Sequence, residues 1–154
     1  INWVANPPGG WVGKYEQTST KKKREGIEIS NIYNINPSAS INLSYTYTAG
    51  DNGEKIIRVP RNQLVVNLGS QFNEKLYLNG NAKYNTDICD TMNGSKCDVK
   101  LDDYTLVNLL AKYKLYRNTN LKLRIENIFN ASYQTVNNFG TSPRAFYISI
   151  DNAF

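Results

Sequence analysis

Apolar and polar residues alternate along most of this chain. The clearest stretch is 41–48, where apolar or aromatic residues take the odd positions from Ile41 to Tyr47 and small polar residues take the even ones. A period of two places the two kinds of residue on opposite faces of a β-strand. The pattern predicts an all-β chain of about seven antiparallel strands, with stripes around 27–29 and over 41–48, 63–71, 76–84, 107–115, 121–126 and 146–154; the fifth stripe is less regular because Leu106 and Leu110 fall on its other face.

The predicted strands are long for a soluble protein. Each is about ten residues, the length of a tilted strand that crosses a membrane, whereas soluble strands more often have five or six residues. Their polar faces carry Lys, Arg, Glu and several Asn, which suits a water-filled lumen, and no run reaches the ~18 apolar residues of a membrane helix. The sequence does not say which face points inward, so a soluble barrel with an apolar interior stays open as an alternative.

The connections between the predicted strands alternate between short and long. Outer-membrane barrels show this rhythm, because their periplasmic turns are short and their extracellular loops are long. If the last strand ends on the periplasmic side, the only two cysteines and the basic run that begins at Lys21 lie on the extracellular side. The short connections are 34–38, 73–74 and 117–120, and the long ones are 49–61, 86–102 and 130–144.

Composition adds two features to this picture. Hydrophobic residues make up only 40 % of the 154 residues, and eleven residues are tyrosines. The net charge of +5 comes largely from the run Lys21–Arg24, but no nucleic-acid module surrounds it, so we interpret the run as a solvated surface and expect no nucleic-acid partner. The tyrosines near the ends of predicted strands suit the aromatic girdles of a membrane barrel; they are Tyr45, Tyr47, Tyr84, Tyr113 and Tyr116.

The sequence offers few residues suited to catalysis or to metal binding. Histidine is absent, which excludes Ser-His-Asp triads, Cys-His nucleophiles and histidine metal sites. We therefore expect neither an enzyme nor a cofactor. Cys89 and Cys97 flank a short polar loop, which predicts a local disulfide in an oxidising compartment. Asp87, Asp90 and Asp98 lie near them without the spacing of a calcium-binding loop, so we expect a plain acidic loop and no metal site.

Three stretches carry a resemblance to a known family. Their order and spacing span nearly the whole chain. The stretches are Tyr15 with 21–28 (Lys-Lys-Lys-Arg-Glu-Gly-Ile-Glu), 58–64 (Arg-Val-Pro-Arg-Asn-Gln-Leu) and 125–133 (Ile-Glu-Asn-Ile-Phe-Asn-Ala-Ser-Tyr), the last followed by Phe139-Gly140, Pro143-Arg144 and a final alternating strand. Together they resemble the C-terminal barrel of TonB-dependent receptors, and among these the vitamin B12 transporter type.

The resemblance implies a bacterial outer-membrane protein whose barrel of 22 strands surrounds a plug domain. It implies import of a scarce nutrient, cobalamin or a ferric siderophore, with TonB pulling on the plug. Seven strands cannot close such a barrel. Residues 1–154 are therefore expected to be the C-terminal portion of the barrel domain, as a fragment or as one part of a split assembly, and Ile1–Trp3 looks like the end of a strand already under way.

The resemblance also implies partners and site residues. The partners are outer-membrane lipid and lipopolysaccharide, the rest of the barrel and its plug, TonB through the part of the protein outside this chain, the outer-membrane assembly machinery and a small-molecule ligand. A passive porin-like or adhesin barrel and a secreted soluble β-barrel module are the alternatives. The candidate residues are Trp11, Tyr15, Arg58 and Arg61 for ligand contact, Lys122, Arg124 and Glu126 for the lumen or plug, and Phe146, Ile148, Ile150 and Phe154 for a C-terminal assembly signal.

Overall fold

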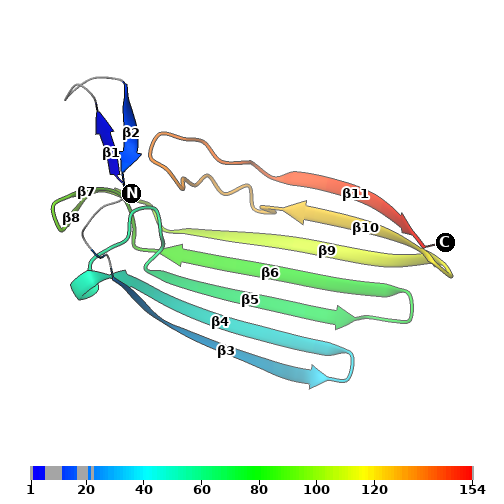
Figure 1. The fold of residues 1–154 in the computed structure, drawn as a ribbon. Coiled ribbons are helices and arrows are strands. Elements are labelled where there is room, and N and C mark those ends of the chain that lie inside the picture. The colour runs from blue at the N-terminus through cyan, green and yellow to red at the C-terminus, as the bar shows by residue number, and fades with distance from the viewer. Residues whose placement is uncertain (1, 6–11, 17–20, 22, 154) are drawn as a thin grey trace.

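The computed structural model describes residues 2–5, 12–16, 21 and 23–153 and consists mainly of strands (Figure 1). Seven of them form one antiparallel sheet in the order β11-β10-β9-β6-β5-β4-β3. The all-β class and the seven antiparallel strands predicted from the alternation are confirmed. The strands of this sheet are β3 (Arg24–Asn36), β4 (Ala39–Gly50), β5 (Asn62–Gln71), β6 (Leu76–Thr86), β9 (Tyr104–Tyr116), β10 (Thr119–Glu126) and β11 (Ala145–Asn152).

Short turns and long connections lie at opposite ends of the sheet (Figure 1). We call these the short-turn end and the loop end. The turns are 37–38, 72–75 and 117–118, and the long connections are 51–61, 87–103 and 127–144. The predicted alternation of short and long connections is therefore confirmed.

Two small hairpins at the loop end were not predicted. Within 87–103, β7 (Ile88–Asn93) pairs with β8 (Lys96–Leu101), where the sequence suggested only a polar loop. Likewise, β1 (Asn2–Ala5) pairs with β2 (Gly13–Glu16) in a separate sheet, so the strand near the start of the chain does not join the large sheet. Strands of four to six residues are too short to establish a clear period.

Helical structure is minimal in the described part of the chain. A single turn of 3-10 helix, η1 (Asp51–Gly53), follows β4. Among the described residues, no helix is long and apolar enough to cross a membrane.

Burial is concentrated at the loop end. The large sheet is a single layer, so most of its side chains are half-buried or exposed. The β7–β8 hairpin packs on the 51–61 connection, where Ile57 and Cys89 form a parallel β-bridge. The described side chains that are buried are Ala49, Ile88, Cys89 and Leu101, together with the polar Asn85, Asp90 and Asn127.

Candidate functional site

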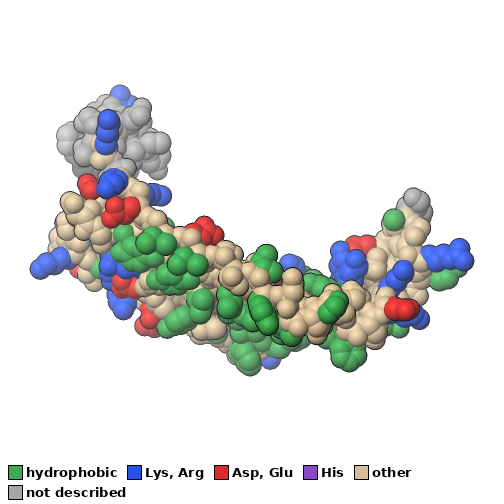
Figure 2. Space-filling model, turned by 90° about the horizontal axis from the view of Figure 1, so that it is seen from below, with side chains coloured by type: hydrophobic (Ala, Val, Ile, Leu, Met, Phe, Trp, Pro, Cys, Tyr) green, Lys and Arg blue, Asp and Glu red, His purple; other side chains and the backbone are tan. Residues whose placement is uncertain are grey.

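One face of the large sheet carries a continuous apolar band. Strand pairing brings the apolar residues of neighbouring strands opposite one another, because the period of two stays in register across the sheet apart from shifts next to the short turns, at 34–36 and 119–120. Figure 2 shows hydrophobic side chains gathered along the lower, convex side of the molecule, with many of the charged side chains toward its ends. One complete row across all seven strands is Tyr33, Ile41, Leu68, Gly80, Leu109, Ile125 and Phe146.

The height of this band matches the apolar layer of a membrane. On β6 it runs from Leu76 to Tyr84. At about 3.4 Å per residue and a tilt of about 40°, those eight steps rise about 21 Å, close to the ~25 Å apolar band of outer-membrane barrels. Its side chains are well exposed, and Ile148 in β11 exposes 75 % of its surface. So large an exposed apolar surface is expected where lipid covers it.

The opposite face is polar and carries a row of asparagines. Asn42, Asn67, Asn81 and Asn108 lie opposite one another on β4, β5, β6 and β9. The side-chain amide of Asn81 donates to Oδ1 of Asn67 over 2.7 Å, and that of Asn108 donates to Oδ1 of Asn81 over 3.3 Å. Because each amide is both a donor and an acceptor, the row forms hydrogen bonds without carrying charge. This arrangement fits a hydrated lumen.

The three residues predicted to face the lumen do lie on this polar face, and all three have partners within the wall. Lys122 forms an ion pair with Asp151. Arg124 forms an ion pair with Glu126 at 3.1 Å, and its guanidinium lies 4.3 Å from the ring centroid of Tyr147. The Lys122–Asp151 pair and the Arg124–Tyr147 contact join β10 to β11, whereas the Arg124–Glu126 pair lies within β10. Contact of Lys122, Arg124 or Glu126 with a plug remains a prediction.

At the loop end, Asp87 is surrounded by basic side chains. Lys55 forms an ion pair with Asp87, Arg61 approaches it from the same connection with Nε 3.6 Å from Oδ2, and Lys100 approaches from β8 with Nζ 3.9 Å from Oδ1. Burial raises the pKa of Asp87, but the hydrogen bond from Lys55 and the three positive charges outweigh it and hold the pKa below its ordinary value. Asp87 thus ties the β7–β8 hairpin to the 51–61 connection.

Asp90 makes a second junction between loops. Nε of Arg58 donates to Oδ1 of Asp90 over 2.8 Å, and the backbone N–H of Arg58 donates to the carbonyl of Cys89 over 2.7 Å. The hydrogen bond from Arg58 lowers the pKa of Asp90 against the effect of burial, and a backbone hydrogen bond from Asn137 lowers it further. A disulfide joins Cys89 to Cys97 across the hairpin. Three long connections therefore meet at Asp90.

Asn127 is the first residue of the third long connection and fixes the shape of its start. Its side chain is only 5 % exposed, and its φ of 49° lies in the left-handed region. Its amide donates to the carbonyl of Ala131 over 2.9 Å and accepts from the Ala131 N–H over 2.8 Å. Its own backbone N–H donates to Oδ1 of Asn108 over 2.9 Å. Asn127 thus links the asparagine row to the 127–144 connection, a role that the sequence analysis missed although Asn127 lies within the 125–133 stretch.

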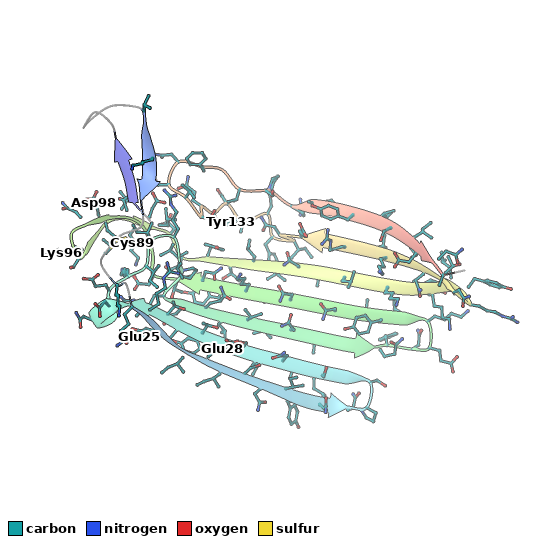
Figure 3. All side chains as sticks on the ribbon, in the orientation of Figure 1. Glu25, Glu28, Cys89, Lys96, Asp98 and Tyr133 are labelled. Carbon is teal, nitrogen blue, oxygen red and sulfur yellow. A yellow bond between two sulfur atoms is a disulfide. The ribbon has the colours of Figure 1, made fainter. Side chains whose placement is uncertain are left out.

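A groove of about 440 Å³ lies at the loop end, between the residues that precede β3, the 51–61 connection and the tip of the β7–β8 hairpin. Its basic lining includes Lys21, Lys23 and Arg24 of the basic run, and Lys55. Asp51 and Glu54 add an acidic part to the lining, and Ile56, Ile57 and Met92 form its apolar part. Figure 3 labels Glu25 of β3 and Cys89 of β7, which both lie at the loop end.

The remaining predicted site residues fall in several places. Trp11 and Phe154 lie outside the described residues, and Tyr15 lies on β2, in register with Trp3 of β1. Arg61 donates a hydrogen bond to the carbonyl of Gly53 within its own connection over 2.6 Å, and its contact with Asp87 joins that connection to 87–103. In the described part of the chain, no group of three or more Cys, Asp or Glu side chains is placed to hold a metal ion. Phe146, Ile148 and Ile150 lie on the apolar face of β11, in register with Ile125, Leu123 and Leu121.

Known proteins share this sequence pattern and this sheet. A model of the family described as TonB dependent receptor-like, beta-barrel matches residues 2–131. Over 57 residues, 37 % of this chain, the sequence is 32 % identical to the vitamin B12 transporter BtuB of Vibrio cholerae serotype O1. The structure of P. aeruginosa FpvA bound to heterologous pyoverdines has a TM-score of 0.68 at 23 % identity over 84 % of this chain. The ferric-catecholate import receptor Fiu of E. coli K12 has a TM-score of 0.68 at 20 % identity over 86 % of this chain.

The chain belongs to the TonB-dependent receptor β-barrel family, and the protein is a bacterial outer-membrane protein. This agrees with the apolar band and with the resemblance seen in the sequence. The chain spans 9 % of the BtuB sequence that it matches, 19 % of the FpvA chain and 21 % of the Fiu chain.

Proposed function

We propose that this chain forms part of the barrel wall of an active importer of a scarce nutrient. The observation that carries the proposal is the apolar band on one face of seven paired strands, backed by a polar face that carries asparagines and charged residues. A wall of this kind meets lipid on one side and a hydrated lumen on the other. The family match supports a receptor or transporter and no enzymatic role.

Residues 1–154 make up a C-terminal portion of the barrel domain in this proposal. A sheet edge cannot face lipid, because its backbone N–H and C=O groups would be unsatisfied there. The two edge strands, β3 and β11, therefore pair with further strands of the barrel. The apolar face of β11, with Phe146, Ile148 and Ile150, serves in this proposal as the assembly signal.

The loop end is the proposed entry side for the nutrient. Its groove combines apolar side chains with cationic ones that outnumber the acidic Asp51 and Glu54, which suits an anionic or hydrogen-bonding small molecule. Tyr15 and Arg58 are the proposed ligand contacts, and half of the Arg58 side chain remains exposed beside Asp90. Cobalamin and ferric siderophores are the proposed ligands, in line with the relatives named above. The proposed energy source is TonB, acting on a plug within the completed barrel.

A pair of adjacent valines tests the orientation of the wall. Val66 lies on the apolar face of β5 opposite Leu43 and Ala82, and Val65 lies on the polar face opposite Ser44 and Lys83. Arginine on the lipid face near the middle of the bilayer costs about 2–4 kcal/mol. We expect Val66→Arg to lower the urea stability of the protein in lipid bilayers by that amount, and the matched Val65→Arg to have a much smaller effect. Equal losses would contradict this orientation.

Uptake assays in cells test active import. Cells that depend on this protein for cobalamin or a ferric siderophore are expected to lose uptake when TonB is deleted or the proton gradient is collapsed. Uptake that persists without TonB would show a passive pore and contradict the proposal. Comparing the two nutrients in the same cells decides between them.

A further inference from the structure

The β7–β8 hairpin has an Asn-Gly dipeptide at its tip. Asn93 is the last residue of β7 and lies in register with Lys96, so that Gly94 and Ser95 form the turn between the strands. Gly94 has a φ of 60°, which glycine adopts readily at the first position of such a turn. Asn93, Gly94 and Ser95 are all exposed, and the hairpin projects from the loop end (Figure 1). The dipeptide is therefore in contact with water.

An Asn-Gly dipeptide can react with its own backbone. The glycine nitrogen attacks Cγ of the asparagine side chain and forms a bond to it, while the amide nitrogen of that side chain leaves as ammonia with the proton of the glycine N–H. Water then opens the five-membered succinimide ring at either carbonyl, which yields aspartate or isoaspartate. Glycine has no side chain to obstruct the attack. Water is the one co-reactant, so the local structure decides where the reaction occurs.

The chain contains three Asn-Gly dipeptides, and one of them lies within the wall. Asn79–Gly80 is part of β6, which pairs with β5 on one side and β9 on the other. The side-chain amide of Asn79 also donates to the carbonyl of Leu68 over 3.2 Å. Ring closure requires the asparagine backbone to rotate until Cγ lies over the next nitrogen. The two strand pairings prevent this rotation, so Asn79 is protected.

The second dipeptide, Asn52–Gly53, lies in a turn that hydrogen bonds close. The N–H of Glu54 donates across the dipeptide to the carbonyl of Asp51 over 3.0 Å. Arg61 donates to the carbonyl of Gly53 over 2.6 Å. Rotation of the Asn52 backbone would have to open both bonds. This dipeptide is therefore partly protected.

The dipeptide at the hairpin tip has no such restraint. Among the described residues, none forms a hydrogen bond with the side chain of Asn93 or with the N–H of Gly94. Asn93 belongs to the last pair of a two-stranded ladder, and its strand pairs with β8 alone in that ladder. We infer that Asn93 is a site of spontaneous deamidation, at which the protein acquires aspartate or isoaspartate as it ages. This inference does not depend on the proposed function.

Deamidation changes the charge at the loop end. A carboxylate replaces a neutral amide opposite Lys96. Met92 and Gly94, on either side of Asn93, line the groove together with the basic run, so the new carboxylate lowers the positive charge around that groove. In isoaspartate the backbone also runs through one additional carbon atom, which shifts the register of the turn. The disulfide from Cys89 to Cys97 still joins the two strands of the hairpin.

Ageing of the protein in isolated outer membranes at mildly alkaline pH tests the inference. Peptide mapping by mass spectrometry measures deamidation at each dipeptide, and isoaspartyl methyltransferase labels isoaspartate. We expect product at Asn93 to accumulate about tenfold faster than at Asn52, because the turn at Asn52 has to open two hydrogen bonds first. Asn79 should remain unmodified. Asn93→Gln should lose the product at the tip, since glutamine would have to close a larger ring, and Asn52→Gln is the matched control that should retain it.

The same membranes denatured in urea supply the reference rates. In urea the three dipeptides should react at similar rates, because the folded structure no longer distinguishes them. Equal rates at Asn93 and Asn52 in the folded protein would overturn the inference, since the open tip would then give no advantage. Absence of product at Asn93 in the folded protein would also reject it, because the hairpin would then hold the tip in a conformation that cannot cyclise.

Discussion

The two ends of the sheet differ in whether their charged side chains have partners. At the loop end, Asp87 and Asp90 are paired with basic residues of another connection, and a disulfide lies beside them. At the short-turn end, the cations of β9 and its turns lack such partners among the described residues. The loop end is thus organised by contacts within this chain, whereas the short-turn end carries charge that its own wall does not neutralise.

This difference suggests what each end has to do. Long connections lose more conformational entropy on ordering than tight turns do, so ion pairs, a disulfide and buried amides are needed to hold one arrangement of the loops. Tight turns are already fixed by their strands. Their charged side chains are free to meet a partner that lies outside the wall.

Among the changes that test this contrast between the two ends, loss of the disulfide should have the largest effect. Replacing both cysteines, as Cys89→Ser/Cys97→Ser, removes a cross-link across eight residues and should destabilise the folded hairpin by about 2–3 kcal/mol on the chain-entropy estimate. Hydrogen exchange should become faster in β7 and β8 while the amides of β5 and β6 are unchanged. Unchanged exchange in the hairpin would show that the ion pairs alone hold the loop end.

The next effect is loss of the Asn127 amide. Asn127→Ala leaves the Ala131 N–H and carbonyl without their partner, which should destabilise the start of the 127–144 connection by about 1–2 kcal/mol. Asn138→Ala is the control, because Asn138 also has a positive φ, of 62°, but is exposed. Faster proteolysis within 127–144 is expected for Asn127→Ala only. Equal proteolysis of the two variants would mean that the backbone conformation matters and the amide does not.

The wall strands were more predictable from the sequence than the loop end. The alternation predicted the wall strands well, because a half-exposed strand has to repeat its face at every second residue, as in Ile41–Tyr47. The alternation of short and long connections was predictable for the same reason, because the ends of each alternating stretch mark where a connection begins. The structure confirms it. Tyr113 and Leu121, 8 positions apart in sequence, are direct neighbours on the apolar face.

The loop end was less predictable because its contacts join residues far apart in the sequence. Nothing near Asp87 indicates that its partners are Lys55 and Arg61, about thirty positions away, and the acidic loop appeared as plain surface. Arg58 was predicted as a ligand contact, and the structure adds a bond to Asp90 that no local motif indicates. The asparagine row, too, depends on the register between four strands and has no local signature.

Acid should loosen the loop end and leave the short-turn end unchanged. The lowered pKa of Asp87 means that its ion pairs stabilise the fold above the ordinary aspartate pKa of 3.8, and that this contribution is lost as the pH falls through the lowered folded-state value. Hydrogen exchange of β7 and β8, corrected for the intrinsic pH effect, should therefore increase below about pH 4. In Asp87→Asn this acid-induced increase should shrink. An increase of the same size at the short-turn end would remove the contrast between the ends.

The smallest effect is expected from reversing one charge at the short-turn end. Lys112→Glu places a carboxylate opposite Lys122 in place of a second ammonium group, which should stabilise the β9–β10 pair by about 0.2–1 kcal/mol. Lys83→Glu, which faces Val65 and Leu106, should not stabilise the wall in this way. Urea titrations of the protein in lipid bilayers measure the stability of both variants. If Lys112→Glu lowered the stability of the wall, Asp151, which forms an ion pair with Lys122, would neutralise Lys112 as well, and the contrast between the two ends would disappear.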